Sequence, residues 1–356
     1  MRSPRAWKNF LMREWLLLGS FTGLFLTSLY LRRFPKYSLL ELKVLFVLFI
    51  FLIIIKGLEN SLVLKKIASK IEDGSRVAFK LVLTTFFLSM FITNDVALLV
   101  LVPLTLCLEI ERKDLLVILE ALAANAGSAL TPFGNPQNLF LYWYYNLRPM
   151  VFLKTIAPFS FTFLILLGIV TFFLSSVRPK SEKKEIKLGP SAPFYLVFLV
   201  VFILAAIRII PVAIGGIVLF YALFKDRPSL NIDYALLGTF FCLFGLTENL
   251  KFIFISSLKH PEHVFLLSAG LSQIISNVPA ALLLAKFTTH WKALLWGVSV
   301  GGFGNLIGSL ANLIAYRLFV IDPTLRESSP KFLLEFTLLG YLAFGIGVVL
   351  FYLVVQ

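Results

Sequence analysis

Hydrophobic residues in this chain gather into long runs that are separated by short polar segments. Most runs are long enough, or nearly long enough, to cross a bilayer as helices. The uninterrupted runs lie at about 15–31, 42–64, 150–177, 192–207, 209–224, 233–250 and 331–355. Alternating segments of about ten residues, which are typical of a membrane β-barrel, do not occur. We therefore predict an all-α polytopic membrane protein.

One further apolar segment, 114–147, is broken in its middle by the stretch SALTPFGNPQNLFLYW. Pro132 and Pro136 each remove a backbone donor and prevent a regular helix between them. Gly134 permits backbone angles and close approaches that other residues do not. The stretch predicts a helix, an unwound turn and a second half-helix that starts near Pro136.

A second polar stretch, GNLIGSLAN at 304–312, predicts the same interruption within 292–320, here without proline. An unpaired backbone amide in hydrocarbon costs several kcal/mol. A broken membrane helix therefore persists only where protein, water or a ligand satisfies the freed backbone groups. Both breaks are for this reason candidate functional sites.

Two other segments, 77–110 and 262–290, carry a polar tip between two apolar arms. The tips are TND at 93–95 and SNVP at 276–279. Each arm of the first segment extends roughly 24 Å as a helix, which is marginal for a core of about 30 Å. We predict two re-entrant hairpins; the alternative is ordinary pairs of spans joined by tight external turns.

The chain repeats this order of features in two halves. We predict an N-terminal repeat at 1–177, a cytoplasmic linker at 178–191 and a C-terminal repeat at 192–356. An odd number of crossings between the halves would invert the second, which is a common arrangement in transporters. One constant offset aligns three positions of the broken segments: Gly127 with Gly301, Gly134 with Gly308, and Asn138 with Asn312.

Composition and charge agree with a protein of the lipid bilayer. The chain is 59% hydrophobic, its mean hydropathy is +0.90 and its net charge is +14. Lys and Arg are more frequent in the segments on the N-terminal side of the membrane, which predicts a cytoplasmic N-terminus in the cell (inner or plasma) membrane. The positive charge therefore does not indicate nucleic acid. Whether 192–224 forms two spans or one kinked segment stays open. A single kinked segment would reverse the membrane orientation of the second half.

Known catalytic motifs and metal clusters are missing from the sequence. The two cysteines lie singly in apolar context, and no P-loop, HExxH or GxSxG pattern occurs. We predict that the protein is not an enzyme and needs no cofactor except Na⁺ as a coupling ion.

The breaks and tips are expected to place four half-helix N-termini, at about 95, 136, 278 and 309, near the membrane midplane. Positive helix ends suit an anion, and freed carbonyl groups suit Na⁺. As Na⁺ ligands we predict Asn94, Asp95 and Asn277. The full set of substrate- or ion-binding candidates is Thr93, Asn94, Asp95, Thr131, Gly134, Asn135, Gln137, Ser276, Asn277, Val278, Asn305, Gly308 and Ser309.

Of the acidic residues in the apolar segments, Asp95 and Glu120 have two interpretations each. Asp95 is either the N-cap of the second arm or a cation or proton site, since intramembrane carboxylates mark ion pathways. Glu59 and Glu248 recur in the two halves and are expected in the scaffold, with Lys56 one turn from Glu59. Glu120 is either interfacial or part of the pathway.

Together these motifs resemble the ion transporter superfamily, which includes divalent-anion/sodium symporters, citrate-transporter-like proteins, arsenite permeases and a class of Na⁺/H⁺ antiporters. The resemblance implies inverted repeats with re-entrant hairpins, a scaffold region, a moving transport region, elevator-type alternating access and a homodimer. The residues that carry it are GLENSLVLKKIA (57–68), TNDVALLVLVPL (93–104), GSALTPFGNPQNL (127–139), SNVPAALLL (276–284) and GNLIGSLANL (304–313).

The tips depart from the symporter branch, whose two tips are Ser-Asn-Thr and hold sodium and carboxylate. Asn94 and Asn277 match that pattern, whereas Asp95 and Val278 do not, which puts a dicarboxylate substrate in doubt. An Asp after the tip Asn is more similar to the arsenite-permease and antiporter branches.

We therefore expect a secondary active transporter that moves a small anion or oxyacid, coupled to Na⁺ or H⁺. A Na⁺/H⁺ antiporter that uses Asp95 is the alternative within the same class, and an uncoupled anion channel is the alternative from another class. Substrate identity, coupling ion and direction of transport are left open by the sequence.

Overall fold

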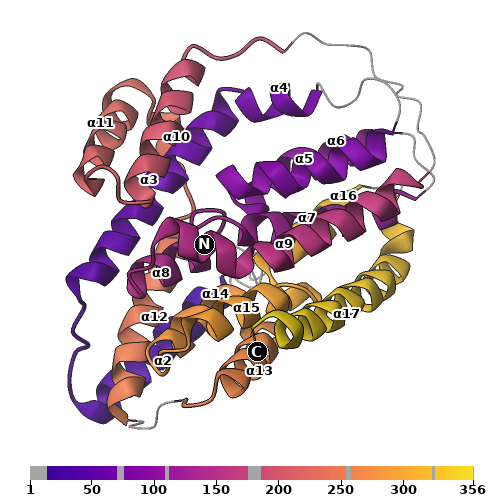
Figure 1. Ribbon diagram of the computed structural model, residues 1–356. Helices are drawn as coiled ribbons and strands as arrows, with labels where there is room; N and C mark the ends of the chain where they lie inside the picture. Colours follow the sequence, from indigo (N-terminus) through magenta and orange to yellow (C-terminus); the bar gives the residue numbers. More distant parts are fainter. Residues whose placement is uncertain are drawn as a thin grey trace, which may run out of the picture.

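The computed structural model describes residues 14–69, 76–108, 112–174, 186–253, 258–322 and 325–355, and in these ranges all regular structure is helical (Figure 1). The α-helices are α2 (Trp15–Leu31), α3 (Leu39–Asn60), α4 (Val63–Ser69), α5 (Val77–Ile92), α6 (Asn94–Cys107), α7 (Lys113–Ala129), α8 (Pro136–Tyr144), α9 (Pro149–Phe172), α10 (Ala192–Ala206), α11 (Gly215–Lys225), α12 (Tyr234–Ile253), α13 (Pro261–Ile275), α14 (Asn277–Ala285), α15 (Trp291–Gly301), α16 (Leu310–Ile321) and α17 (Ser329–Val354). Short 3₁₀ turns are η1 (Val212–Ile214), η2 (Arg227–Leu230), η3 (Leu306–Gly308) and η4 (Arg326–Ser328). The all-α prediction is confirmed.

Three helical stretches of the described chain are long and apolar enough to cross a membrane: Pro149–Phe172, Arg227–Ile253 and Ser329–Val354. Both arms of the first hairpin and the second half of the broken segment 292–320 are shorter and still apolar. Of the predicted linker 178–191, only 186–191 belong to the described residues. Residues 109–111, at the end of the predicted first hairpin, also lie outside them.

Each hairpin turns at one residue with positive φ. Thr93 joins α5 to α6 at φ 79° and ψ 150°, and Ser276 joins α13 to α14 at φ 74° and ψ 155°. Positive φ is rare for residues other than glycine and is rarer still for a β-branched residue such as threonine. Finding the same unusual turn at both tips shows that the two segments fold alike.

The segment 192–224 forms two antiparallel helices instead of one kinked helix. The chain reverses around Arg208, whose φ is 67°, and the ring of Tyr221 in α11 contacts Phe194 and Phe198 at the start of α10. Both helices pack on α3, and Figure 1 shows the three together at one side of the molecule.

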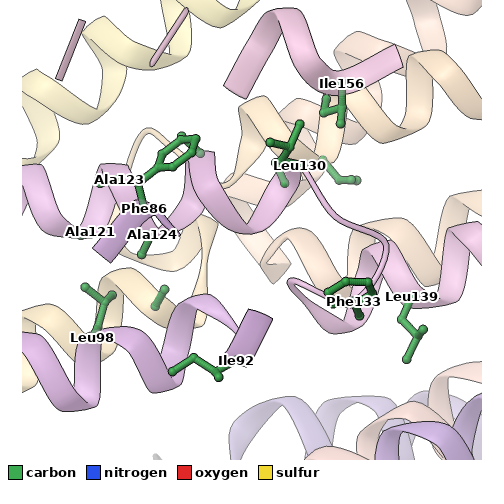
Figure 2. Close-up of a cluster of buried hydrophobic side chains, with 14 of the residues drawn as sticks. Phe86, Ile92, Leu98, Ala121, Ala123, Ala124, Leu130, Phe133, Leu139 and Ile156 are labelled. Carbon is green, nitrogen blue, oxygen red and sulfur yellow. The ribbon is translucent and has the colours of Figure 1, made fainter. Parts of the chain in front are cut away.

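Helix α7 occupies the centre of the opposite side, packed against α5, α6, α9, α16 and α17. Figure 2 shows its small residues Ala121, Ala123 and Ala124 in one buried cluster with Phe86 of α5 and Leu98 of α6. Small side chains let membrane helices approach closely. The hairpin and the first broken helix therefore pack as one unit, which positions the site.

Candidate functional site

A cavity of about 310 Å³ lies where the two hairpin tips and the two helix breaks meet. The first residues of α6, α8, α14 and α16 line it, together with the starts of α2 and α12. The four segments come from widely separated parts of the sequence, and their interruptions converge on one space. The predicted site residues among the lining are Asn94, Asp95, Gln137, Ser276, Asn277, Val278 and Ser309.

Four helix N-termini therefore border one cavity. The first backbone N–H groups of a helix have no partner within it and carry the positive end of the helix dipole. Side chains satisfy some of these donors. Asn135 accepts from the backbone N of Asn138 at 2.9 Å, and Ser309 accepts from the backbone N of Ala311 at 3.3 Å. The remaining positive field suits an anionic group.

Asn94 is held by a chain of buried amides. Its Nδ2 donates to Oδ1 of Asn125 at 3.0 Å, and Nδ2 of Asn125 donates to Oδ1 of Asn312 at 2.7 Å. This chain links the first hairpin tip through α7 to the second broken helix. Sequence reasoning missed Asn125, although one amide among the alanines of LEALAANAGSAL was a usable signal.

Two lining residues have buried acceptor oxygens that no donor in the described chain reaches, Oδ1 of Asp95 and Oε1 of Gln137. Buried polar atoms normally have a hydrogen-bond partner, so such atoms call for a ligand or water. The side chain of Asp95 makes no capping bond, because the N-cap position of α6 belongs to Thr93. Oxygen acceptors of this kind suit a hard cation or a donor group on a substrate.

The described residues hold no group of three His, Cys, Asp or Glu that fits a metal ion. A cation in the cavity would therefore be bound by a mixture of amide, hydroxyl and carboxylate oxygens.

The other predicted site residues lie beside the cavity and not among its lining residues: Thr93, Thr131, Gly134, Asn135, Asn305 and Gly308. Several of them fasten the breaks. Thr131 Oγ1 donates to the carbonyl of Met90 at 2.6 Å, and Asn305 Nδ2 donates to the carbonyl of Gln273 at 3.1 Å. Each contact ties a break to the first arm of the hairpin in the same half.

Side-chain amides also bind the carbonyl groups that the breaks release. Nδ2 of Asn138 donates to the carbonyls of Ser128 and Thr131 at 3.2 and 3.0 Å. In the second half, Nδ2 of Asn312 donates to the carbonyls of Gly302 and Asn305 at 2.9 and 3.1 Å. These carbonyls are thus engaged by protein donors, in agreement with the cost of free backbone groups in a membrane.

Charged residues at the edge of the cavity were not among the predicted site residues. Glu14 and Asp233 lie just before α2 and α12, and Arg317 lies in the later part of α16. Oδ1 of Asp233 accepts from the backbone N of Leu236 at 2.9 Å. Glu14 and Asp233 lie far along the chain from any break, and Arg317 lies eight residues after Ser309 in a helix that gave no local signal of a site.

Acidic residues away from the cavity have other partners. Lys56 pairs with Glu59 at 3.0 Å, which confirms that contact. Glu248 lies 3.3 Å from Nζ of Lys286. Glu120 is fully buried and its Oε1 accepts from Thr105 Oγ1 at 2.7 Å, whereas no described donor reaches its Oε2.

Broken helices whose ends meet at one cavity are typical of helical membrane transporters. The chain belongs to the citrate transporter family, whose model matches residues 16–301. An uncharacterized transporter of Methanocaldococcus jannaschii is 38% identical over 297 residues, which cover 79% of this chain and 82% of the relative. The inner membrane protein YbiR of Escherichia coli is 33% identical over 300 residues, or 75% of this chain and 77% of the relative. The protein is accordingly a multi-pass membrane transporter and not an enzyme.

Proposed function

We propose that the protein is a secondary active transporter that moves a small anion or oxyacid, coupled to Na⁺ or H⁺. One observation carries the proposal: four helix N-termini and two unpartnered acceptors, Asp95 Oδ1 and Gln137 Oε1, line a single cavity. Helix N-termini attract an anion, and the acceptors attract a cation or a proton. A site with both features binds an anion and a coupling cation together.

Coupling follows from the electrostatics of the bilayer. A lone charge at the membrane interior is expensive, whereas a paired charge costs less. When Asp95 and a substrate anion occupy one cavity, Na⁺ or H⁺ lowers their mutual repulsion. The fully loaded site therefore crosses more readily than a partly loaded one, which is the requirement for coupled transport.

Alternating access would come from inverted repeats with an elevator-type motion. The repeated tips, Thr93 and Ser276, and the repeated fastening contacts of Asn138 and Asn312 support two equivalent halves. With the N-terminus in the cytoplasm, the starts of α2 and α12 face the cytoplasm, and the cavity opens on that side. A homodimer is part of the same proposal and follows from the family resemblance.

Binding followed by transport tests the proposal. Purified protein would be screened by thermal shift against acetate, succinate, citrate, phosphate and arsenite, with and without Na⁺. Anions that stabilise the protein would then be tested for uptake into proteoliposomes under a Na⁺ gradient or a pH gradient. We expect accumulation with one gradient and none without it. Uptake that no gradient accelerates would refute coupling.

A Na⁺/H⁺ antiporter is the second candidate, and the unpartnered carboxylate oxygen of Asp95 favours it. One carboxylate that binds Na⁺ and H⁺ in turn is sufficient for exchange. In liposomes without any transported anion, an antiporter would move protons in response to a Na⁺ gradient. The anion transporter would show this flux only after substrate is added.

A further inference from the structure

Arg317 is the one residue with a fixed positive charge among the described residues that line the cavity. It shares one face of α16 with Leu310 and Ile314, at the spacing that aligns side chains along a helix. This face runs from the second helix break towards the edge of the cavity. Arg317 therefore extends the site beyond the broken turns themselves.

The Arg317 side chain makes no hydrogen bond and no ion pair with any described residue. Some other arginines of the described chain are engaged: Arg112 pairs with Glu335 at 2.8 Å, and Arg208 donates to the carbonyl of Tyr142 at 2.7 Å. A guanidinium presents several donors in a planar fork that fits two oxygens of a carboxylate or oxyanion. Arg317 is exposed and lines the cavity, and its donors are not taken up by the described residues.

An independent observation deeper in the cavity also indicates a ligand. Gln137, at the N-terminus of α8, is only 2% exposed, and its Oε1 has no donor. A substrate that reaches both residues would offer acceptor oxygens to Arg317 and a donor to Gln137, which gives it a defined orientation.

The charges of the lining limit the charge of the substrate. Three carboxylates, those of Glu14, Asp95 and Asp233, line the same cavity as Arg317. The one guanidinium attracts one negative group, and the carboxylates repel any further negative charge on the substrate. The cavity therefore favours an anion of low charge.

We infer that Arg317 binds the charged group of the substrate and that the substrate is a monovalent anion with a carboxylate or oxyanion group. The inference rests on the proposed function and deepens it, since it names a specificity-determining residue and a charge class. The positive charge of Arg317 selects for an anion, and its planar guanidinium group selects for a substrate group with two coplanar oxygens.

Binding measured separately from transport tests this inference. Acetate, succinate and citrate offer one, two and three carboxylates of the same chemistry, and their affinities for the purified full chain would be compared at constant pH and ionic strength. Acetate has no donor for Gln137 and therefore tests the Arg317 contact alone; wild type should bind it more tightly than succinate or citrate. Arg317→Gln should weaken acetate binding about tenfold or more, and Arg317→Lys should weaken it less, because lysine keeps the charge but loses the fork.

Lys225→Gln is the matched control. It removes one positive charge from an exposed residue that lines a different groove, between α10 and α11. Its acetate affinity and the melting temperature of each variant without acetate should equal those of wild type. Unchanged acetate affinity in Arg317→Gln, absence of acetate binding to wild type, or tighter binding of citrate would each overturn the inference. Loss of gradient-driven uptake with acetate binding intact would count against the proposed coupling and not against Arg317.

Discussion

At the scale of single residues, Asp95 and Asn94 are neighbours with different surroundings. The Asn94 amide is bonded to Asn125 at 3.0 Å, whereas Oδ1 of Asp95 has no donor. Asn94 thereby joins the architecture of the breaks, and Asp95 is left to interact with what enters the cavity. Substitution of a residue that is bonded within the protein should affect stability, whereas substitution of a residue that faces the cavity contents should affect transport.

Asp95→Asn should abolish gradient-driven accumulation while the melting temperature changes little. The side chain makes no capping bond, so the amide loses no hydrogen bond, but it neither titrates nor neutralises a cation. Exchange of substrate across the membrane should survive, because exchange does not require the empty carrier to move. Uptake, exchange and thermal unfolding, all measured on one preparation, test this prediction, with Glu59→Gln outside the cavity as the control. Full accumulation by Asp95→Asn would remove the coupling role.

Asn125→Ala should mainly lower the stability of the protein, whereas Asn277→Ala should mainly abolish transport. Removing Asn125 leaves Nδ2 of Asn94 and Oδ1 of Asn312 without this partner, and each unsatisfied buried group costs about 1–3 kcal/mol. Within the described ranges, the one side-chain hydrogen bond of Asn277 is a 3.4 Å contact from Ser276 Oγ, so its loss should spare stability and abolish transport. Melting temperatures in detergent and uptake by each variant test this contrast. A stable, fully active Asn125→Ala would show that the amide chain is dispensable.

At the scale of elements, Lys286 fastens the end of the second hairpin to two other helices. Its Nζ lies 2.6 Å from Glu41 at the start of α3 and 3.3 Å from Glu248 in α12. The side chains of Lys286 and Glu41 are 7% and 4% exposed. Any motion of α14 relative to α3 and α12 has to open this buried pair.

Lys286→Met should destabilise the protein by about 3–5 kcal/mol, because it leaves the Glu41 carboxylate buried without its cation. Adding Glu41→Gln should recover much of that loss, since the unpaired charge is removed. Lys56→Met is the control: its pair with Glu59 is far more exposed and should contribute about 0–1 kcal/mol. Denaturant unfolding of wild type and the three variants gives the values. Equal losses for Lys286→Met and Lys56→Met would show that the Lys286 pair does not fasten α14.

Elements were predictable from the sequence where a local rule applies. The arm 77–92 and the start of the half-helix at Pro136 agree with α5 and α8, because apolar length and proline act over a few residues. The reversal at Arg208 was not predictable, since it depends on packing of α10 and α11 against α3. Arg317 and Lys286 were missed for the same reason, as their neighbours are distant in sequence.

At the scale of the whole molecule, the two halves are alike in their breaks but not in their polar detail. Asn125 has Ser299 at the corresponding place of the second half, and Ser299 Oγ donates to the carbonyl of Leu295 and not to a hairpin tip. The first tip is therefore fastened to the broken helices by a buried amide chain that the second tip lacks. In the proposed carrier, the two hairpins are therefore held differently: the first at its tip by the amide chain, and the second at its end by Lys286.

Solute counterflow tests the central claim, that the cavity is the site of a carrier, most directly. Proteoliposomes loaded with an unlabelled anion that stabilises the protein would be diluted into a trace of the same anion carrying a radiolabel. A carrier should accumulate label transiently above its equilibrium level, and Asn277→Ala should not. Equilibration without an overshoot in wild type would indicate an open pore and contradict the account.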